Sequence, residues 1–153
     1  MNPIMEPKRL AEIVSAVTEN MLGLSFMPDV AGSPWSSLVW RTAVLPIPGG
    51  HPLTIGLSSD ERGCIALSAA MFGCSPSTID AAMMDDALCE LVNITAGLLK
   101  KELAIAPSPA LPKITHGSDA PYMAPSQGRS SVVLRGRDVG LVLWVVEGVA
   151  LPA

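Results

Sequence analysis

The sequence predicts an α/β (α+β) fold in which a mostly antiparallel sheet of about five or six strands packs against three helices. Three observations predict it. Apolar residues recur at helical spacing in three segments, β-type runs are bounded by dense turn formers, and consecutive β-type runs are joined as hairpins. The elements follow in the order helix, hairpin, two helices, then three strands. The length of 153 residues fits a single domain, residues 1–153.

The first helix is predicted over residues 7–22, with Gly23 as its stop. Its apolar positions repeat at three- and four-residue spacing and comprise Leu10, Ile13, Val14, Val17 and Met21. Pro28 then indicates a loop. Two strands, residues 37–45 and 53–57, follow as a hairpin around the turn-rich segment PIPGGHP.

The second helix follows the segment SSDERG. Either Ser58 or Ser59 is expected to cap it, with Asp60 and Glu61 in the first turn, where the helix dipole favours anions. Gly73 is expected to end it.

The third helix is predicted to be long. The segment STID, Ser77 to Asp80, resembles a capping box with Asp in the place of Glu. From there the helix runs to about Ala104, and Lys100 and Lys101 suit its carboxyl end.

Three strands complete the chain, at residues 113–117, 130–134 and 140–147, and GRDVG joins the last two as a hairpin. The apolar run VGLVLWVV in the last strand allows two interpretations. It is either a strand at a subunit interface or a central strand of the core.

The amino-acid composition restricts the classes of function and partner that are expected. Charged residues make up only 16% and the mean hydropathy is +0.42, so a buried subunit interface is expected. No apolar run reaches the roughly 20 residues of a spanning helix, and MNPIMEPKR does not resemble a signal peptide, so a cytoplasmic protein is expected. A net charge of −4 with scattered basic residues argues against nucleic acid as a partner.

Sites for common chemistry are missing from the sequence. Cys64, Cys74 and Cys89 are expected to be reduced thiols, and with only His51 and His116 besides them no metal site is predicted. Nucleotide-binding glycine motifs and the nucleophile elbow are absent.

One feature of the third helix does carry a candidate site. At about 100° per residue, a stripe of Asp86, Glu90, Asn93 and Gly97, here called the polar stripe, lies opposite the apolar face. The predicted core face consists of Leu88, Leu91, Val92, Thr95, Leu98 and Leu99.

The polar stripe has two interpretations. It can be an ordinary solvated face, because outward positions of amphipathic helices are normally polar. Two residues favour a docking surface instead. Asn93 is unfavourable in mid-helix because its amide competes for backbone hydrogen bonds. Gly97 costs roughly 1 kcal/mol relative to Ala, yet would let another backbone approach closely.

The pattern D-x-x-x-E-x-x-N, formed by Asp86, Glu90 and Asn93, resembles the signature of the CheC/CheX/FliY chemotaxis phosphatases. The segments NITAG, LSSDERGCIALSAAMFG and LPKITHG are similar to the CheX branch, and element order matches over nearly the whole chain. A CheC-like fold and a single CheX-like phosphatase domain are implied. One departure is plain: Pro112, the counterpart of the family's proline, follows Asn93 at a shorter spacing than in the family.

The resemblance implies a phosphatase acting on the phospho-aspartate of a CheY-type response regulator. Asn93 would position the hydrolytic water, Glu90 would dock to the partner's lysine, and Asp86, Gly97 and Pro112 would be accessory. No cofactor is implied in this chain, and Mg²⁺ is expected on the partner. The resemblance also implies a homodimer formed through sheet edges.

The first helix is similar to the third but incomplete. Ser15 and Glu19 fit the pattern, whereas Leu22 stands in the place of the asparagine. One active site per chain is therefore expected. Two alternatives remain open: a module that binds receiver domains without catalysis, and a structural relative within a flagellar switch.

Overall fold

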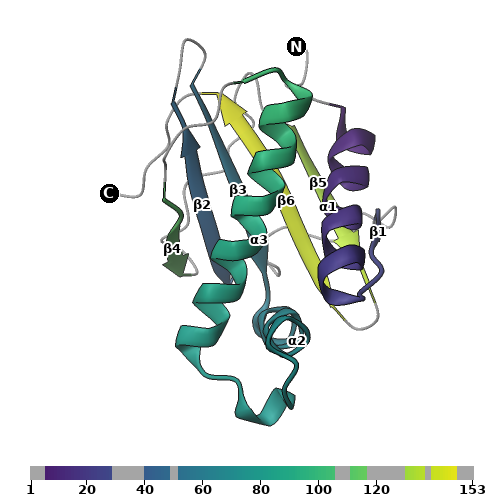
Figure 1. Cartoon of the computed structure of the whole chain (residues 1–153), viewed down its shortest axis with the longest axis vertical. Helices are drawn as coiled ribbons and strands as arrows, with labels where there is room; N and C mark the ends of the chain where they lie inside the picture. The colour runs from purple at the N-terminus through teal and green to yellow at the C-terminus, as the bar shows by residue number, and fades with distance from the viewer. Residues whose placement is uncertain are drawn as a thin grey trace.

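The computed structural model describes residues 6–28, 40–48, 52–105, 111–116, 130–136 and 139–147. Its helices pack on an antiparallel sheet, which confirms the predicted fold class (Figure 1). The helical elements are α1 (Pro7–Leu22), α2 (Glu61–Phe72), the 3₁₀ turn η2 (Pro76–Thr78) and α3 (Ala81–Glu102). The strands are β1 (Met27–Pro28), β2 (Arg41–Ile47), β3 (Leu53–Ser59), β4 (Lys113–His116), β5 (Ser130–Arg135) and β6 (Gly140–Glu147).

The sheet has the strand order β1-β5-β6-β3-β2-β4, and every neighbouring pair is antiparallel. This order has an internal twofold pattern. The chain runs α1-β1-β2-β3 and later α3-β4-β5-β6, and the two halves meet at the β3–β6 pair. Each half donates its first strand to the other, because β1 pairs with β5 and β4 pairs with β2. The two halves are therefore interlocked copies of one arrangement.

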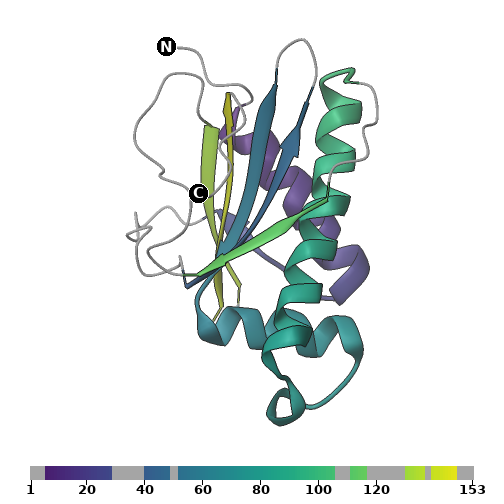
Figure 2. The ribbon, with the colours of Figure 1, turned by 90° about the vertical axis from the view of Figure 1, so that its left-hand side faces the viewer.

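The long helices α1 and α3 lie side by side on the same face of the sheet (Figures 1 and 2). Helix α3 contacts β2 and β3, whereas α1 contacts β5. The main core lies between these helices and the sheet, and it includes Leu10, Val14, Leu45, Ile55, Leu91 and Leu143. Because side chains alternate along a strand, the opposite face carries a second cluster of Val44, Val142, Trp144 and Val146.

Strand β6 is enclosed between β5 and β3, and its residues Gly140 to Val146 are buried. The run VGLVLWVV is therefore a central core strand, and its alternative interpretation as an interface strand is wrong. An interface at this strand therefore does not explain the low content of charged residues.

Strand boundaries differ from the prediction in five places. β2 begins at Arg41, so Trp40 lies outside it, and β5 extends to Arg135. β2 continues through Pro46 to Ile47, because β4 pairs only with Arg41 to Val44 and leaves this end of β2 an edge that tolerates proline. β3 extends to Ser59. The two-residue strand β1 at Pro28 was expected to be a loop. Predicted strand residues 37–39 and 117 lie outside the described residues.

Both predicted helix caps were wrong, each in favour of an aspartate. The side chain of Asp60 caps α2 by accepting from the Gly63 amide at 2.7 Å, while Ser58 and Ser59 remain in β3. Asp80 caps α3 by accepting from the Met83 amide at 2.9 Å. α3 also ends at Glu102 rather than near residue 104.

Two apolar residues assigned to buried faces are exposed: Met21 at 43% and Leu98 at 40%. Met21 lies in the last turn of α1. The helix stops at Gly23 as predicted, and Gly23 adopts a left-handed conformation (φ 68°). Leu98 faces a groove beside α1, described below, instead of the sheet.

Gly56 makes room for the largest buried side chain of the sheet. A Cβ atom built at this position would overlap the indole ring of Trp144, its cross-strand partner, and Trp144 is 1% exposed. Gly56→Ala is therefore expected to lower the free energy of unfolding by about 1–3 kcal/mol, the usual effect of overpacking. Urea unfolding followed by circular dichroism measures it.

The control for this prediction is the same change in a Trp144→Leu background. The smaller side chain removes the overlap, so Gly56→Ala should cost less there. Equal costs in the two backgrounds would contradict the assignment of the effect to the indole.

Candidate functional site

The polar stripe lies on the solvent side of α3. Asp86, Glu90, Asn93 and Gly97 are all exposed. The opposite side of the helix is buried against the sheet through Leu88, Leu91, Val92, Thr95, Ala96 and Leu99. Glu90 and Asn93 are three residues apart, so their Cβ atoms are about 5–6 Å apart and both side chains reach the same patch of solvent.

Local bonds keep α3 regular along the polar stripe. Asp80 accepts a hydrogen bond from the amide of Met83 at the first turn. Lys100 and Lys101 occupy the last turn, where positive charges interact favourably with the helix dipole. Thr95 is buried and donates its hydroxyl to the Leu91 carbonyl at 2.7 Å. The polar stripe is thus carried by a capped helix of 22 residues.

Two ion pairs tie α3 to other elements. Near its end, both oxygens of Glu102 accept from Arg9 of α1 at 2.8 Å. The hydrogen bonds from Arg9 lower the pKa of Glu102, and those to Glu102 raise the pKa of Arg9. Near its start, Asp85 lies 3.2 Å from Arg41 of β2. α3 is therefore attached to a neighbouring helix at one end and to the sheet at the other.

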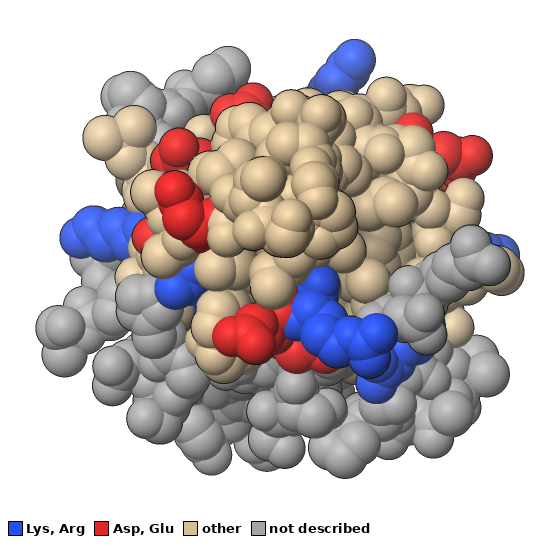
Figure 3. Space-filling model, turned by 90° about the horizontal axis from the view of Figure 1, so that it is seen from below, with Lys and Arg blue, Asp and Glu red and all other residues tan. Residues whose placement is uncertain are grey.

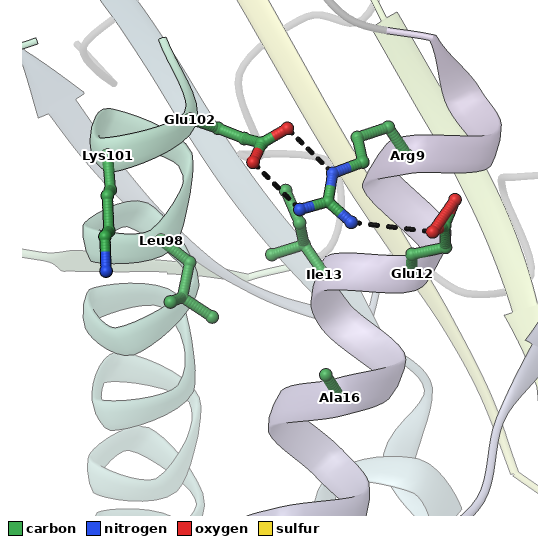
Figure 4. A pocket seen from close by; sticks show the side chains of 7 residues that line it. All are labelled: Arg9, Glu12, Ile13, Ala16, Leu98, Lys101 and Glu102. Atoms are coloured by element: carbon green, nitrogen blue, oxygen red, sulfur yellow. Dashed lines mark hydrogen bonds and ion pairs between the residues drawn. The ribbon is translucent and has the colours of Figure 1, made fainter. Parts of the chain in front are cut away.

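A groove with a volume of about 450 Å³ lies between α1 and α3 (Figure 4). Leu98 projects from α3 toward α1, and Ala16 on α1 is too short to fill the space opposite. The groove is lined by Arg9, Glu12, Ile13, Ala16, Leu98, Lys101 and Glu102. The sequence did not predict this groove, because Leu98 occurs at helical spacing with the apolar residues and was therefore assigned to the core face. It lies next to Gly97, at one end of the polar stripe.

Gly97 makes no close contact that would require a glycine among the described residues. Apart from its two chain neighbours and the backbone of its own helix, no heavy atom of the described chain would lie within 4 Å of a Cβ atom built there. Helix packing thus gives no reason for a glycine that costs about 1 kcal/mol. The open space lies outside α3, where an approaching molecule would use it.

The corresponding side chains of α1 are used differently. Ser15 is half-buried, and its hydroxyl donates to the Phe26 carbonyl at 3.1 Å. Glu19 is exposed, but Leu22 is a half-buried apolar residue packed against the core. At the corresponding positions, α1 therefore presents the carboxylate of Glu19 and has the apolar Leu22 in place of an amide, while the amide of Asn20 is out of phase with the pattern.

Pro112 does not lie on the helix with the other candidate residues. It is half-buried immediately before β4, an edge strand that pairs with β2 and contacts α3. The structure thus brings together Asp86, Glu90, Asn93 and Gly97 on one helix face and leaves Pro112 on a separate segment.

The end of the molecule formed by α2, η2 and the start of α3 is largely uncharged (Figure 3). No charged residue occurs between Arg62 and Asp80. Charged side chains surround this neutral surface without crossing it. The carboxylates of Asp86 and Glu90 lie on α3 beyond this uncharged surface.

Other chemistry receives little support from the described part of the chain. Burial raises the pKa of the Cys64 thiol to about 12, and burial, with the nearby carboxylates of Asp85 and Asp86, raises that of Cys89. In residues 6–28, 40–48, 52–105, 111–116, 130–136 and 139–147, no group of three His, Cys, Asp or Glu side chains is arranged to hold a metal ion. No helix in these ranges combines the length and apolarity needed to cross a bilayer.

Comparison with known families decides where the chain belongs. The family model described as chemotaxis phosphatase CheX matches residues 41–134, which is more than half of the chain and includes all of α3. The chain belongs to the CheX family. No curated protein sequence matches this CheX-family chain.

Solved structures share the fold. A CheX from Desulfovibrio desulfuricans is 18% identical, with a TM-score of 0.68 over 92% of this chain and 97% of that one. CheX from Vibrio vulnificus is 14% identical, with a TM-score of 0.73 over 97% and 100%. CheX from Borrelia burgdorferi, solved in a complex with CheY, BeF₃ and Mg²⁺, is 13% identical, with a TM-score of 0.66 over 94% and 98%. The CheX/CheC-like fold predicted from the sequence is confirmed.

Gly97→Ala should stabilise the isolated protein. The added methyl group enters open space and removes the helix penalty of glycine, so the free energy of unfolding should rise by about 0.5–1 kcal/mol. Thermal or urea unfolding measures it. A destabilised Gly97→Ala variant would show that the backbone at this position needs glycine for the fold itself.

Proposed function

We propose that this chain hydrolyses the phospho-aspartate of a CheY-type response regulator in bacterial chemotaxis. The observation that carries the proposal is the pair Glu90 and Asn93, exposed one turn apart on a capped helix whose opposite face is buried. Membership of the CheX family supports the reaction, and the Borrelia CheX–CheY complex supports the kind of partner.

The proposed mechanism requires little covalent chemistry from this chain. An aspartyl phosphate is an acyl phosphate, and its hydrolysis is accelerated mainly by positioning and electrostatic stabilisation. The carboxamide of Asn93 suits this task, because its oxygen accepts a hydrogen bond from the attacking water while its NH₂ group donates to neighbouring acceptors. Asn93 would hold water in line with the phosphorus atom, and Mg²⁺ would be bound by the partner.

Glu90 would set the register of docking. Its exposed carboxylate is one turn from Asn93 and would pair with the active-site lysine of the regulator. Asp86 would add a second carboxylate at the start of the polar stripe. Gly97 would provide clearance for the partner's backbone, and Pro112 would belong to the edge of the site.

We further propose that each chain has one active site and forms a homodimer. We also propose that it lies in the cytoplasm together with its partner. α1 supports the single site, because Leu22 replaces the amide. In the described sheet, the edges are β1 and β4, so these strands are the candidates for a contact between subunits. Sedimentation at two concentrations would test the dimer.

Asn93→Ala should abolish most of the acceleration without weakening the fold. The change removes the group that positions water, and a loss of about 10²-fold in kcat is expected. Stability should not fall, because Ala is a better helix former than Asn at an exposed position. The lifetime of the aspartyl phosphate on a cognate receiver domain measures kcat at saturating concentrations of the variant.

Binding of the Asn93→Ala variant to the receiver domain should stay within about threefold of wild type, since docking is assigned to Glu90. If the wild-type chain binds the receiver domain but leaves the phosphate lifetime unchanged, the non-catalytic binding module is the correct interpretation. Full activity of the Asn93→Ala variant would remove the assigned role of Asn93.

Glu90→Lys should weaken docking itself. The substitution places a positive charge opposite the partner's lysine, and Kd should rise by at least about tenfold. Glu19→Lys is the matched control, because it makes the same charge change at the corresponding exposed position of α1. Equal effects of the two variants would show that net charge, and not the polar stripe, controls docking.

A further inference from the structure

Arg41 is a buried cation at the point where the sheet meets the start of α3. It is the first residue of β2 and is 7% exposed. Its Nη1 atom lies 3.2 Å from Oδ1 of Asp85 and donates to the Ala81 carbonyl at 3.3 Å. The guanidinium also stacks on the ring of Trp40, 4.7 Å from the ring centroid.

These contacts are poorly suited to stabilising the fold. Among the described residues, the buried Nε atom of Arg41 has no hydrogen-bond partner. The buried Oδ1 atom of Asp85 lies near the guanidinium but accepts no hydrogen bond from the described part of the chain. Arg41 is the buried member of the pair, since its side chain is 8% exposed and that of Asp85 is 37% exposed. A buried charge with an unsatisfied group carries a desolvation penalty, and apolar replacements of buried pairs are often neutral or stabilising. Stability alone therefore does not account for Arg41.

The same contacts are well suited to fixing geometry. Ala81 and Asp85 lie four residues apart, so a single guanidinium touches consecutive turns at the beginning of α3. Arg41 itself is fixed on both sides, because its backbone pairs with Ser59 of β3 and His116 of β4. Contacts from one side chain to two turns add a local restraint on the start of α3, beyond the burial of its apolar face. Asp85 directly precedes Asp86, where the polar stripe begins.

We propose that the Arg41–Asp85 pair is a positioning device that sets the placement of α3 so that Glu90 and Asn93 reach the partner together. The role rests on the proposed phosphatase function. Arg41 and Asp85 are positioning residues, since they act through the helix and not on the phosphate. A displacement of about 1 Å at a reacting group can cost 10²-fold in rate, so a small shift of α3 has a large effect on catalysis.

The other ion pair of α3 supplies a control. Arg9 and Glu102 also connect α3 to another element, at the end of the helix away from Asp86. Their side chains are 44% and 38% exposed, so the arginine of this pair faces solvent, whereas that of the Arg41–Asp85 pair is only 8% exposed. Exposed pairs constrain geometry weakly and contribute little to stability.

The test compares the double variant Arg41→Met/Asp85→Leu with the control Arg9→Gln/Glu102→Gln. The first should keep the melting temperature of the wild type or raise it, change receiver-domain Kd by less than about threefold, and lower kcat by at least about tenfold. The control should leave kcat and Kd within about twofold of wild type. Arg41→Lys retains the charge and should recover part of the lost kcat.

Two results would overturn the proposal. Wild-type kcat in the double variant would show that α3 needs no such constraint. A lower melting temperature with parallel losses in binding and kcat would make the pair an ordinary structural contact.

Amide hydrogen exchange separates this proposal from the proposed function. Residues 81–90 should exchange faster in the Arg41→Met/Asp85→Leu variant than in the wild type and the control, whereas residues 95–102 should not. If the wild-type chain does not shorten the phosphate lifetime, the phosphatase proposal fails, and the exchange result alone decides the role of the pair. Unchanged exchange over residues 81–90 would then refute it.

Discussion

Burial of one face of α3 against β2 and β3 is the constraint on which the candidate site depends. Leu88, Leu91 and Leu99 are each at most 1% exposed, and full burial of such a side chain contributes about 1.5–3 kcal/mol. A rotation of the helix by one residue would expose several of them at once. By comparison, the unfavourable helix propensities of Asn93 and Gly97 together amount to about 1.5 kcal/mol. The core thus determines which way the polar stripe faces, and the helix tolerates residues chosen for another purpose.

The internal twofold pattern explains how one scaffold holds a single candidate site. Two interlocked halves place α1 and α3 in corresponding positions on the same sheet. On α1, Ser15 bonds to the Phe26 carbonyl and Leu22 packs against the core, so these positions serve the fold. On α3, the corresponding positions are exposed. Sequence divergence between two similar helices, rather than a difference in architecture, concentrates the site on α3.

Much of this structure could be predicted from the sequence because periodicity reports burial. The direction of the polar stripe followed from helical spacing, the hairpins followed from their turn-forming segments, and the family resemblance added the CheC-like fold. Cap positions could not be predicted reliably, since Ser59 and Asp60 are both good caps and only the length of β3 decides between them. The exposure of Leu98 depends on Ala16 of another helix, and the role of Arg41 depends on Asp85 far along the chain. Contacts of this kind leave no local pattern.

In the proposed function, α3 is the element that brings Asn93 to a phosphorylated aspartate. The most direct measurement is the lifetime of the aspartyl phosphate on a cognate CheY-type receiver domain, with and without a saturating amount of this protein. A markedly shorter lifetime is expected in its presence. An unchanged lifetime, with binding of the receiver domain demonstrated in the same sample, would contradict the proposed function.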